Sequence, residues 1–169
     1  NRPYFTWKIA MTLDGKIAAL DGSSKWITSV ESREDVSKLR SHADAVLIGT
    51  GTAITDDPSL NSHNIGSRQP RRIVMGKREI PANHKLNDKS AATYFVKSHD
   101  ASELLELLKN LEVNQVLVES GPVLATALMK HGLIDEIVAY IAPSILGSGS
   151  SFIGDLNIST LSDRLDYQI

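Results

Sequence analysis

The stretch AVLIGTGT at residues 45–52 decides the fold class of this chain. Its first four residues are all apolar, which is typical of a short strand covered on both faces. Two glycines and two threonines follow at once, and glycine accepts the backbone angles of a tight turn. The stretch therefore predicts a buried strand followed by a turn, a building block of a parallel α/β sheet.

Strand and helix patterns alternate on both sides of this stretch, which predicts one α/β domain whose sheet is parallel in its centre. Ser29 is the expected cap of the first helix, and Gly132 ends the last one. We expect helices at residues 30–41, 101–111 and 123–131. We expect further strands at residues 5–11, 72–75, 92–96, 115–118 and 134–141, with a last strand opening at 165–169.

Composition excludes several classes of protein. The 169 residues suit a single domain, 1–169, and a net charge of −2 favours neither nucleic acid nor an anionic membrane as a partner. No cysteine is present, which excludes disulfides, thiolate zinc sites and a cysteine nucleophile. The five histidines lack metal-ligand spacing, and no apolar run approaches the ~20 residues of a membrane helix. We expect a cytoplasmic protein without a metal site.

The turn after the first buried strand is one candidate ligand site. Gly49 and Gly51 come close to the dinucleotide-binding pattern, but Ile54 stands in place of its third glycine. Arg71 and Arg72 follow about twenty residues later where an acid would contact a ribose, and arginines suit a 2′-phosphate better. Two interpretations stay open here: a nucleotide site and a tight strand-to-helix turn.

A second candidate is the stretch VLVESGP at residues 116–122, where a strand ends in an acid before a glycine and a proline open a helix. Ligands of open α/β sheets bind at the carboxyl ends of strands, close to helix starts. Glu119 is either a charge favoured by the helix dipole or a carboxylate that accepts from a substrate. Similarly, Asp56 and Asp57 before Pro58 form either a cation site or a turn, and Trp26 either packs in the core or stacks on a flat ring.

Five ordered blocks, spread over nearly the whole chain, resemble the reductase domain of the bifunctional riboflavin-biosynthesis deaminase/reductase. The blocks are residues 2–4 with 8–18; 24–28; 39–40 with 43–49; 51–52 with 56–60; and 118–124. Residues 135–136, 141–143 and 146–147 complete the match. The zinc deaminase half of that enzyme has no counterpart in these residues.

The resemblance implies a dihydrofolate-reductase-like fold, a mixed and mostly parallel sheet flanked by helices, in a homodimer. It implies that NADPH reduces the ribosyl group of a phosphorylated pyrimidine, 5-amino-6-(5-phosphoribosylamino)uracil, to a ribityl chain. Lys8 and Asp56 are candidates for the acid that opens the ribose ring. The implied substrate contacts are Ser24, Arg40, Leu60, His63 and Glu119. The implied cofactor contacts are Ala10, Trp26, Gly49, Gly51, Thr52, Asp56, Gly121, Pro122, Val123, Leu124, Ala125, Thr126 and Ala127.

Three departures from the family pattern bear on these expectations. His63 stands where the family has an arginine, and Arg68 could replace it if its loop folds back. Lys77 stands where the family has a serine near the cofactor, and the sequence stops at Ile169 before a closing hairpin. Two alternatives therefore stay open: an idle nucleotide-binding or dimerisation domain of the same fold, and a reductase of another heterocycle such as a pterin.

Overall fold

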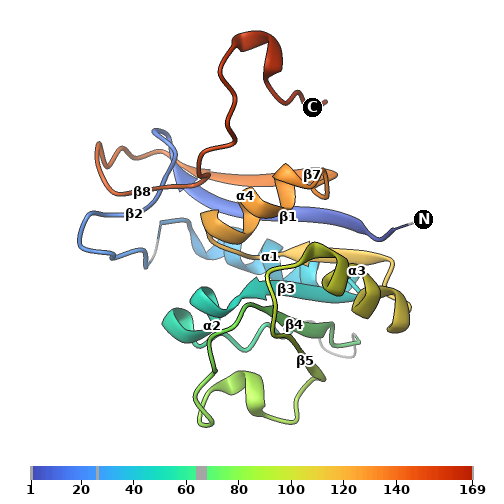
Figure 1. Cartoon of the computed structure of the whole chain (residues 1–169). Helices are drawn as coiled ribbons and strands as arrows, with labels where there is room; N and C mark the ends of the chain where they lie inside the picture. The colour runs from blue at the N-terminus through green and yellow to red at the C-terminus, as the bar shows by residue number, and fades with distance from the viewer. Residues whose placement is uncertain (1, 26, 64–67, 169) are drawn as a thin grey trace.

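The computed structural model describes residues 2–25, 27–63 and 68–168. Its centre is a six-stranded sheet in the order β5-β4-β3-β6-β1-β7, in which every neighbouring pair is parallel (Figure 1). The sheet consists of β1 (Tyr4–Thr12), β3 (Ala45–Gly49), β4 (Arg71–Met75), β5 (Thr93–Val96), β6 (Gln115–Val118) and β7 (Glu136–Ala142). The predicted α/β class and the mostly parallel sheet are confirmed.

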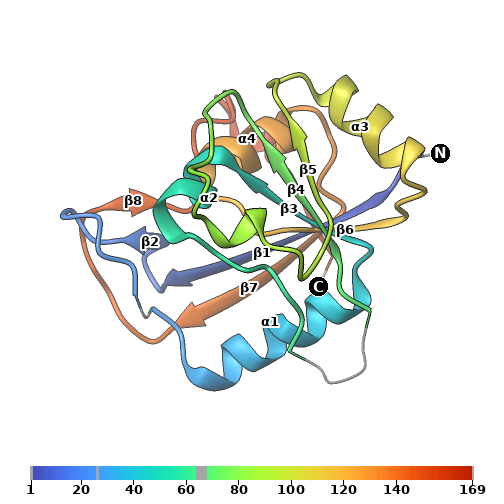
Figure 2. The same cartoon turned by 90° about the horizontal axis from the view of Figure 1, so that it is seen from below.

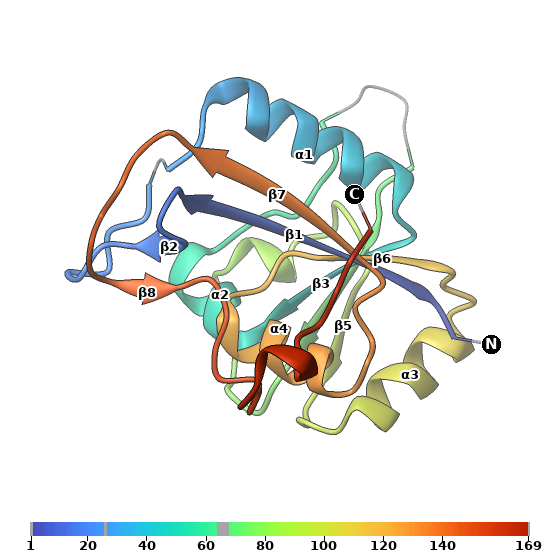
Figure 3. The same ribbon diagram turned by 90° about the horizontal axis from the view of Figure 1, so that it is seen from above.

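Helices cover both faces of the sheet (Figures 2 and 3). On one face, α3 (Ala101–Asn110) and α4 (Pro122–Lys130) contribute buried side chains to the larger apolar core. On the other face, α2 (Thr50–Asp56) and the end of α1 (Val30–His42) pack on a second core that includes Val46 and Ile48. This division explains the wholly apolar run at β3, because successive side chains of that strand enter opposite cores.

Successive side chains of β1 point to opposite faces of the sheet, one of which packs in the core while the other borders the candidate site. Phe5, Trp7 and Ile9 are buried in the larger core, as expected for a strand with period two. Lys8 and Ala10 point to the opposite face, which α1 covers. The strand therefore brings a lysine to the carboxyl edge of the sheet without disturbing the core.

Local signals placed most elements within one or two residues. Ser29 caps α1 by accepting from the Ser32 N–H, and Pro122 occupies the first turn of α4, as predicted. The sequence did not indicate β2 (Lys16–Ala18) and β8 (Ser150–Ser151), whose antiparallel pairing is too short to leave a pattern. The strand predicted at 165–169 was wrong, since residues 165–168 follow the short 3₁₀ turn η2 (Leu161–Asp163) as irregular chain.

Arg72 ties the second core to the loops around it. Its side chain is fully buried and donates to the carbonyls of Ser59, Lys85 and Ala91 and to a carboxylate oxygen of Asp88. Hydrogen bonds from Ser90 and Arg72 lower the pKa of Asp88 to about 2. The guanidinium is therefore committed to the fold, and the expectation that Arg72 faces a 2′-phosphate was wrong.

Gly76, directly after β4, has a φ of +131°, which glycine adopts far more readily than other residues. A Cβ at this position would lie 2.6 Å from the Thr50 hydroxyl oxygen. Gly76→Ala should lower the free energy of unfolding by about 2 kcal/mol, through strain and the clash with a stiff β-branched side chain. Gly132→Ala is the control, since its φ is +63° and nothing lies within 4 Å. Gly132→Ala should lower the free energy of unfolding by about 1 kcal/mol, from backbone strain alone. Equal losses in denaturant titrations would argue against the clash.

Candidate active site

One large cavity opens at the carboxyl edge of the sheet, between α1 and the ends of β1, β6 and β7. Its volume is about 1290 Å³, more than the roughly 300–1,000 Å³ typical of a pocket for one small ligand. Both turns singled out in the sequence reach it, the first through Gly51 and Thr52 and the second through Glu119 and Gly121. They do so because β3 and β6 are neighbours in the sheet. The cavity is large enough for a substrate beside a cofactor.

Three charged side chains meet at the floor of this cavity. Arg40, from the last turn of α1, binds Glu119 with two hydrogen bonds, from Nε to Oε1 at 2.6 Å and from Nη2 to Oε2 at 2.9 Å. The Lys8 ammonium lies 3.6 Å from the same Oε2. All three side chains are at least four-fifths buried, at 16%, 9% and 19% exposure for Arg40, Glu119 and Lys8. The group carries a net positive charge where an anionic ligand can enter.

Electrostatics keep Glu119 ionised. Burial alone would raise the pKa of its carboxyl, but the hydrogen bonds from Arg40 and the charges of Arg40 and Lys8 hold that pKa below its ordinary value. The same contact overcomes the effect of burial on Arg40 and raises its pKa. Glu119 is therefore a permanent hydrogen-bond acceptor in this cavity at neutral pH.

Asp56 is a carboxyl group of a different kind. It ends α2 and lines the same cavity. Burial raises its pKa, and the nearby charges of Lys25 and Lys8 only partly oppose that rise. Asp56 therefore exchanges protons at higher pH than an ordinary aspartate, a property often found in active sites.

The loop after α2 forms a wall of the cavity in a strained backbone conformation. Asp57 and Leu60 have φ values of +41° and +55°, in the left-handed region that side chains other than glycine rarely adopt. Such strain clusters at functional sites and persists only where the surroundings enforce it. Here the backbone N–H of Lys85 donates to Asp57, and Arg72 donates to Ser59 between the two strained residues.

The start of α4 fits the phosphates of a dinucleotide. Gly121 occupies the cap position and has no side chain to accept from the first amide groups of the helix. Space for a Cβ at Gly121 is open, and a second cavity of about 420 Å³ lies against Pro122, Val123 and Thr126. Free amides at the positive end of a helix bind anions.

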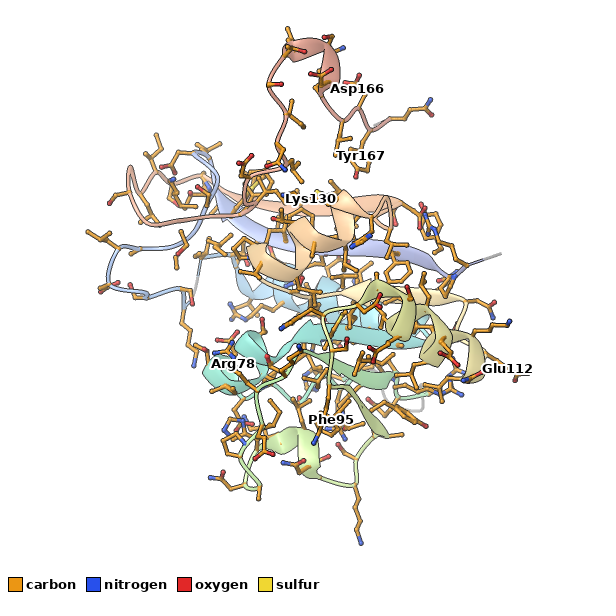
Figure 4. All side chains as sticks on the ribbon, in the orientation of Figure 1. Arg78, Phe95, Glu112, Lys130, Asp166 and Tyr167 are labelled. Atoms are coloured by element: carbon orange, nitrogen blue, oxygen red, sulfur yellow. The ribbon has the colours of Figure 1, made fainter. Side chains whose placement is uncertain are left out.

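Two cations lie near the start of α2. A Cβ on Gly51 would be 2.8 Å from an Nη atom of Arg78, whose exposed side chain extends beside α2 (Figure 4). Lys77 precedes it and is also exposed. This corner of the sheet therefore presents positive charge next to one of the two glycine turns.

Most of the predicted site residues border the main cavity. Those that line it are Lys8, Ala10, Ser24, Arg40, Gly51, Thr52, Asp56, Leu60, His63, Glu119 and Gly121. Pro122, Val123 and Thr126 line the second cavity. Gly49 and Leu124 lie behind these walls, where a Cβ on Gly49 would be 3.8 Å from Leu124, and Ala127 is on the exposed side of α4. Ala125 is fully buried in the larger core, and Trp26 is outside the described residues.

The structure corrects the expectations for Arg68 and Arg71, because both residues lie at the amino ends of strands. Arg68 forms an ion pair with Asp44 at the amino end of β3, at the opposite edge of the sheet from the cavity, so it does not replace the family arginine at His63. Arg71 begins β4 at that same amino edge. Neither side chain reaches the candidate site.

The sequence did not single out Tyr140 or, apart from Arg40, the cavity-facing residues of α1, among them Arg33 and Ser37. Tyr140 could have been found only from strand pairing, since parallel register sets it beside Ala10. Within the described ranges, no three His, Asp or Glu side chains gather as a metal site would require. The described helices include none that is both long and apolar enough to cross a membrane.

Comparisons with known proteins agree with this geometry. A family model described as the RibD C-terminal domain matches residues 3–167. The riboflavin biosynthesis protein RibD of Mycobacterium tuberculosis is 39% identical over 170 residues, which cover 98% of this chain and 50% of that protein. RibD of Aquifex aeolicus is 40% identical over 189 residues, which cover 98% of this chain and 53% of that protein. The chain therefore spans about half the length of the curated relatives it matches.

A solved structure from Thermotoga maritima is similar over the whole of this chain. It is a diaminohydroxyphosphoribosylaminopyrimidine deaminase/5-amino-6-(5-phosphoribosylamino)uracil reductase, and its TM-score to this chain is 0.84 at 27% identity. The match covers 99% of this chain and 52% of that one.

Proposed function

This chain belongs to the RibD C-terminal domain family, and we propose that it reduces the ribosyl group of 5-amino-6-(5-phosphoribosylamino)uracil to a ribityl chain with NADPH. The observation that carries the proposal is the meeting of both glycine turns with the Arg40–Glu119–Lys8 group in one cavity. The bifunctional enzyme of T. maritima, whose name includes this reductase, supports the choice of substrate.

The residues of the cofactor side fit a dinucleotide. The uncapped start of α4 would hold the phosphates, and Thr52 and Ala10 would border the rest of the molecule in the main cavity. Lys77 and Arg78 beside α2 favour a cofactor with an additional phosphate, which supports NADPH. When bound, the nicotinamide supplies a hydride to the former anomeric carbon of the substrate.

The substrate side is the α1 wall with the Arg40–Glu119–Lys8 group. Glu119 accepts hydrogen bonds from the hydroxyl or amino groups of the substrate, and its two cationic neighbours keep it ionised for that purpose. Arg40, fixed by Glu119, and His63, fixed through its backbone N–H by Ser37, face the substrate phosphate. The main contribution of the chain is to hold the two reacting carbons close and aligned. We further propose a homodimer, for which the exposed Leu13, Ile141 and Ile145 provide apolar surface.

The experiment that tests the function follows the absorbance of the reduced nicotinamide as the phosphoribosylaminouracil is added. Oxidation that depends on this substrate is expected. Cofactor binding without oxidation would favour the idle domain, and oxidation with a pterin alone would favour a reductase of another heterocycle.

Lys8 and Asp56 are the two candidates for the acid that protonates the ribose ring as it opens, and different results are expected from their substitution. An ammonium is a proton donor, whereas a carboxyl donates only when protonated. We therefore expect Lys8→Met to lower kcat about a hundredfold, the usual size of acid catalysis, and Asp56→Asn to lower it less. The pH profile of kcat checks the assignment, because a donor at Asp56 would produce a decline with rising pH that the Asn variant lacks. Loss of that decline in Asp56→Asn would transfer the role to Asp56.

A further inference from the structure

The two halves of α1 are attached to the sheet in different ways. In the carboxyl-terminal half, Leu39 packs on the second core and Arg40 binds Glu119. In the amino-terminal half, Val36 is the buried apolar side chain, and it belongs to neither core cluster. This half, which adds no side chain to either core cluster, lines the cavity through Val30 and Arg33.

A hydrogen bond from the sheet reaches this half of the helix. Tyr140 of β7 donates its hydroxyl to a carboxylate oxygen of Asp35 at 2.6 Å. Tyr140 is the register partner of Ala10 on β1, so its side chain is on the face that also carries Lys8, and it lines the cavity. The bond therefore crosses from the edge strand to α1 at the border of the candidate site.

The phenol keeps its proton in this position. Burial raises the pKa of Tyr140, and the hydrogen bond to Asp35 and the charges of Asp35 and Glu119 raise it further. The hydroxyl is consequently a donor throughout the working pH range. A hydrogen bond to a charged acceptor contributes more than one between neutral groups.

We propose that Tyr140 is a positioning residue of the reductase site. Through Asp35 it holds the amino-terminal half of α1 against the cavity, and with it the preceding segment that carries Ser24, Lys25, Ile27 and Thr28. This inference rests on the proposed function, in which that wall binds the substrate. The cofactor side is built on α2 and α4 together with Ala10, which the backbone pairing of β1 holds in place, so it does not depend on the Tyr140 hydroxyl.

Tyr140→Phe removes the hydroxyl and keeps the ring. The KM for the phosphoribosylaminouracil should rise about tenfold, while the KM for NADPH stays unchanged and the melting temperature falls by no more than about 3 °C, since the bond is exposed. Asp35→Ala should reproduce the rise, and the double variant should exceed neither single variant, because both remove one bond. Tyr167→Phe is the matched control. Tyr167 belongs to the carboxyl-terminal segment (Figure 4), and its hydroxyl donates to the Ile134 carbonyl at 3.5 Å.

Hydrogen exchange of the α1 amides gives a readout that does not need turnover. Tyr140→Phe should speed exchange at residues 30–37 and leave β3 and β6 unchanged. The proposal would be overturned by unchanged hydrogen exchange in α1, by an unchanged substrate KM or by an equal rise in both KM values. It would also be overturned if the effects of Tyr140→Phe and Asp35→Ala on the substrate KM multiply in the double variant. If the wild-type chain does not oxidise NADPH, the proposed function fails, and the exchange result alone decides whether Tyr140 positions α1.

Discussion

Glu119→Gln should lower the free energy of unfolding by about 3 kcal/mol, because Arg40 and Lys8 would remain buried without a counter-charge. For a chain of this length, the melting temperature should fall by about 9 °C. The same change should lower kcat/KM about a hundredfold, since the cavity loses its ionised acceptor and the exact orientation of Arg40. Thermal unfolding and steady-state kinetics measure the two effects.

The control is Glu112→Gln, at an exposed glutamate far from the cavity (Figure 4). It should change neither quantity. Acidification gives a second check, because the pKa of Glu119 is lower in the folded chain than its ordinary value of about 4.3. Its stabilisation is complete above that value and disappears as the pH falls through the folded pKa, so the stability difference between wild type and variant should narrow below about pH 4. A difference that is constant with pH would contradict the ion-pair explanation.

Arg72→Met should be the most destabilising change outside the cavity, at about 4 kcal/mol. The substitution fills a similar volume but removes the guanidinium donor of the Ser59 and Ala91 carbonyls, and it takes one of several donors from the Lys85 carbonyl and from Asp88. Denaturant titration measures the loss.

Arg72→Met should also affect kinetics, because Arg72 donates to Ser59, which lies in the strained loop that forms a wall of the cavity. At a temperature where the variant is folded, the substrate KM should rise several-fold. Arg71→Met, one residue earlier on β4 and only partly buried, should change stability by less than about 0.5 kcal/mol. Similar losses for the two variants would show that the hydrogen bonds of Arg72 are not what stabilises these loops.

Periodicity and caps predicted α1, α3, α4 and the six strands of the main sheet, because each of these elements buries a regular pattern of its own residues. The short helix α2 was not predicted, since its seven residues carry neither a cap signal nor a clear period. Pairing between distant segments leaves no such pattern. The link between Tyr140 and Asp35 depends on parallel register, and the ion pair of Arg40 with Glu119 depends on the crossing of α1 over β6. The same limit explains Arg72, since an arginine that binds buried carbonyls and one that binds a phosphate look alike in a sequence.

The family resemblance identified residues that line the cavity, such as Ser24 and Thr52, but it did not show how they are held. The left-handed conformations of Asp57 and Leu60 had no sequence signal, since neither residue is a glycine. Ala125 belongs to a motif whose neighbours border the cavities, yet helical geometry turns its side chain into the core. A motif therefore predicts a neighbourhood better than it predicts contacts.

The position of β1 between β6 and β7 has a consequence for how the chain reaches its native state. β1 pairs only with β6 and β7, which come last among the strands of the main sheet in chain order, and Trp7 donates its indole N–H to the carbonyl of Ser120, 113 positions away in the sequence. Closing so long a loop is entropically unfavourable, and topologies with such distant pairings fold slowly. β1 therefore joins the sheet only when β6 and β7 are available. Lys8 meets Glu119 only when β1 inserts beside β6, so the Arg40–Glu119–Lys8 group is completed at the end of folding rather than along the way.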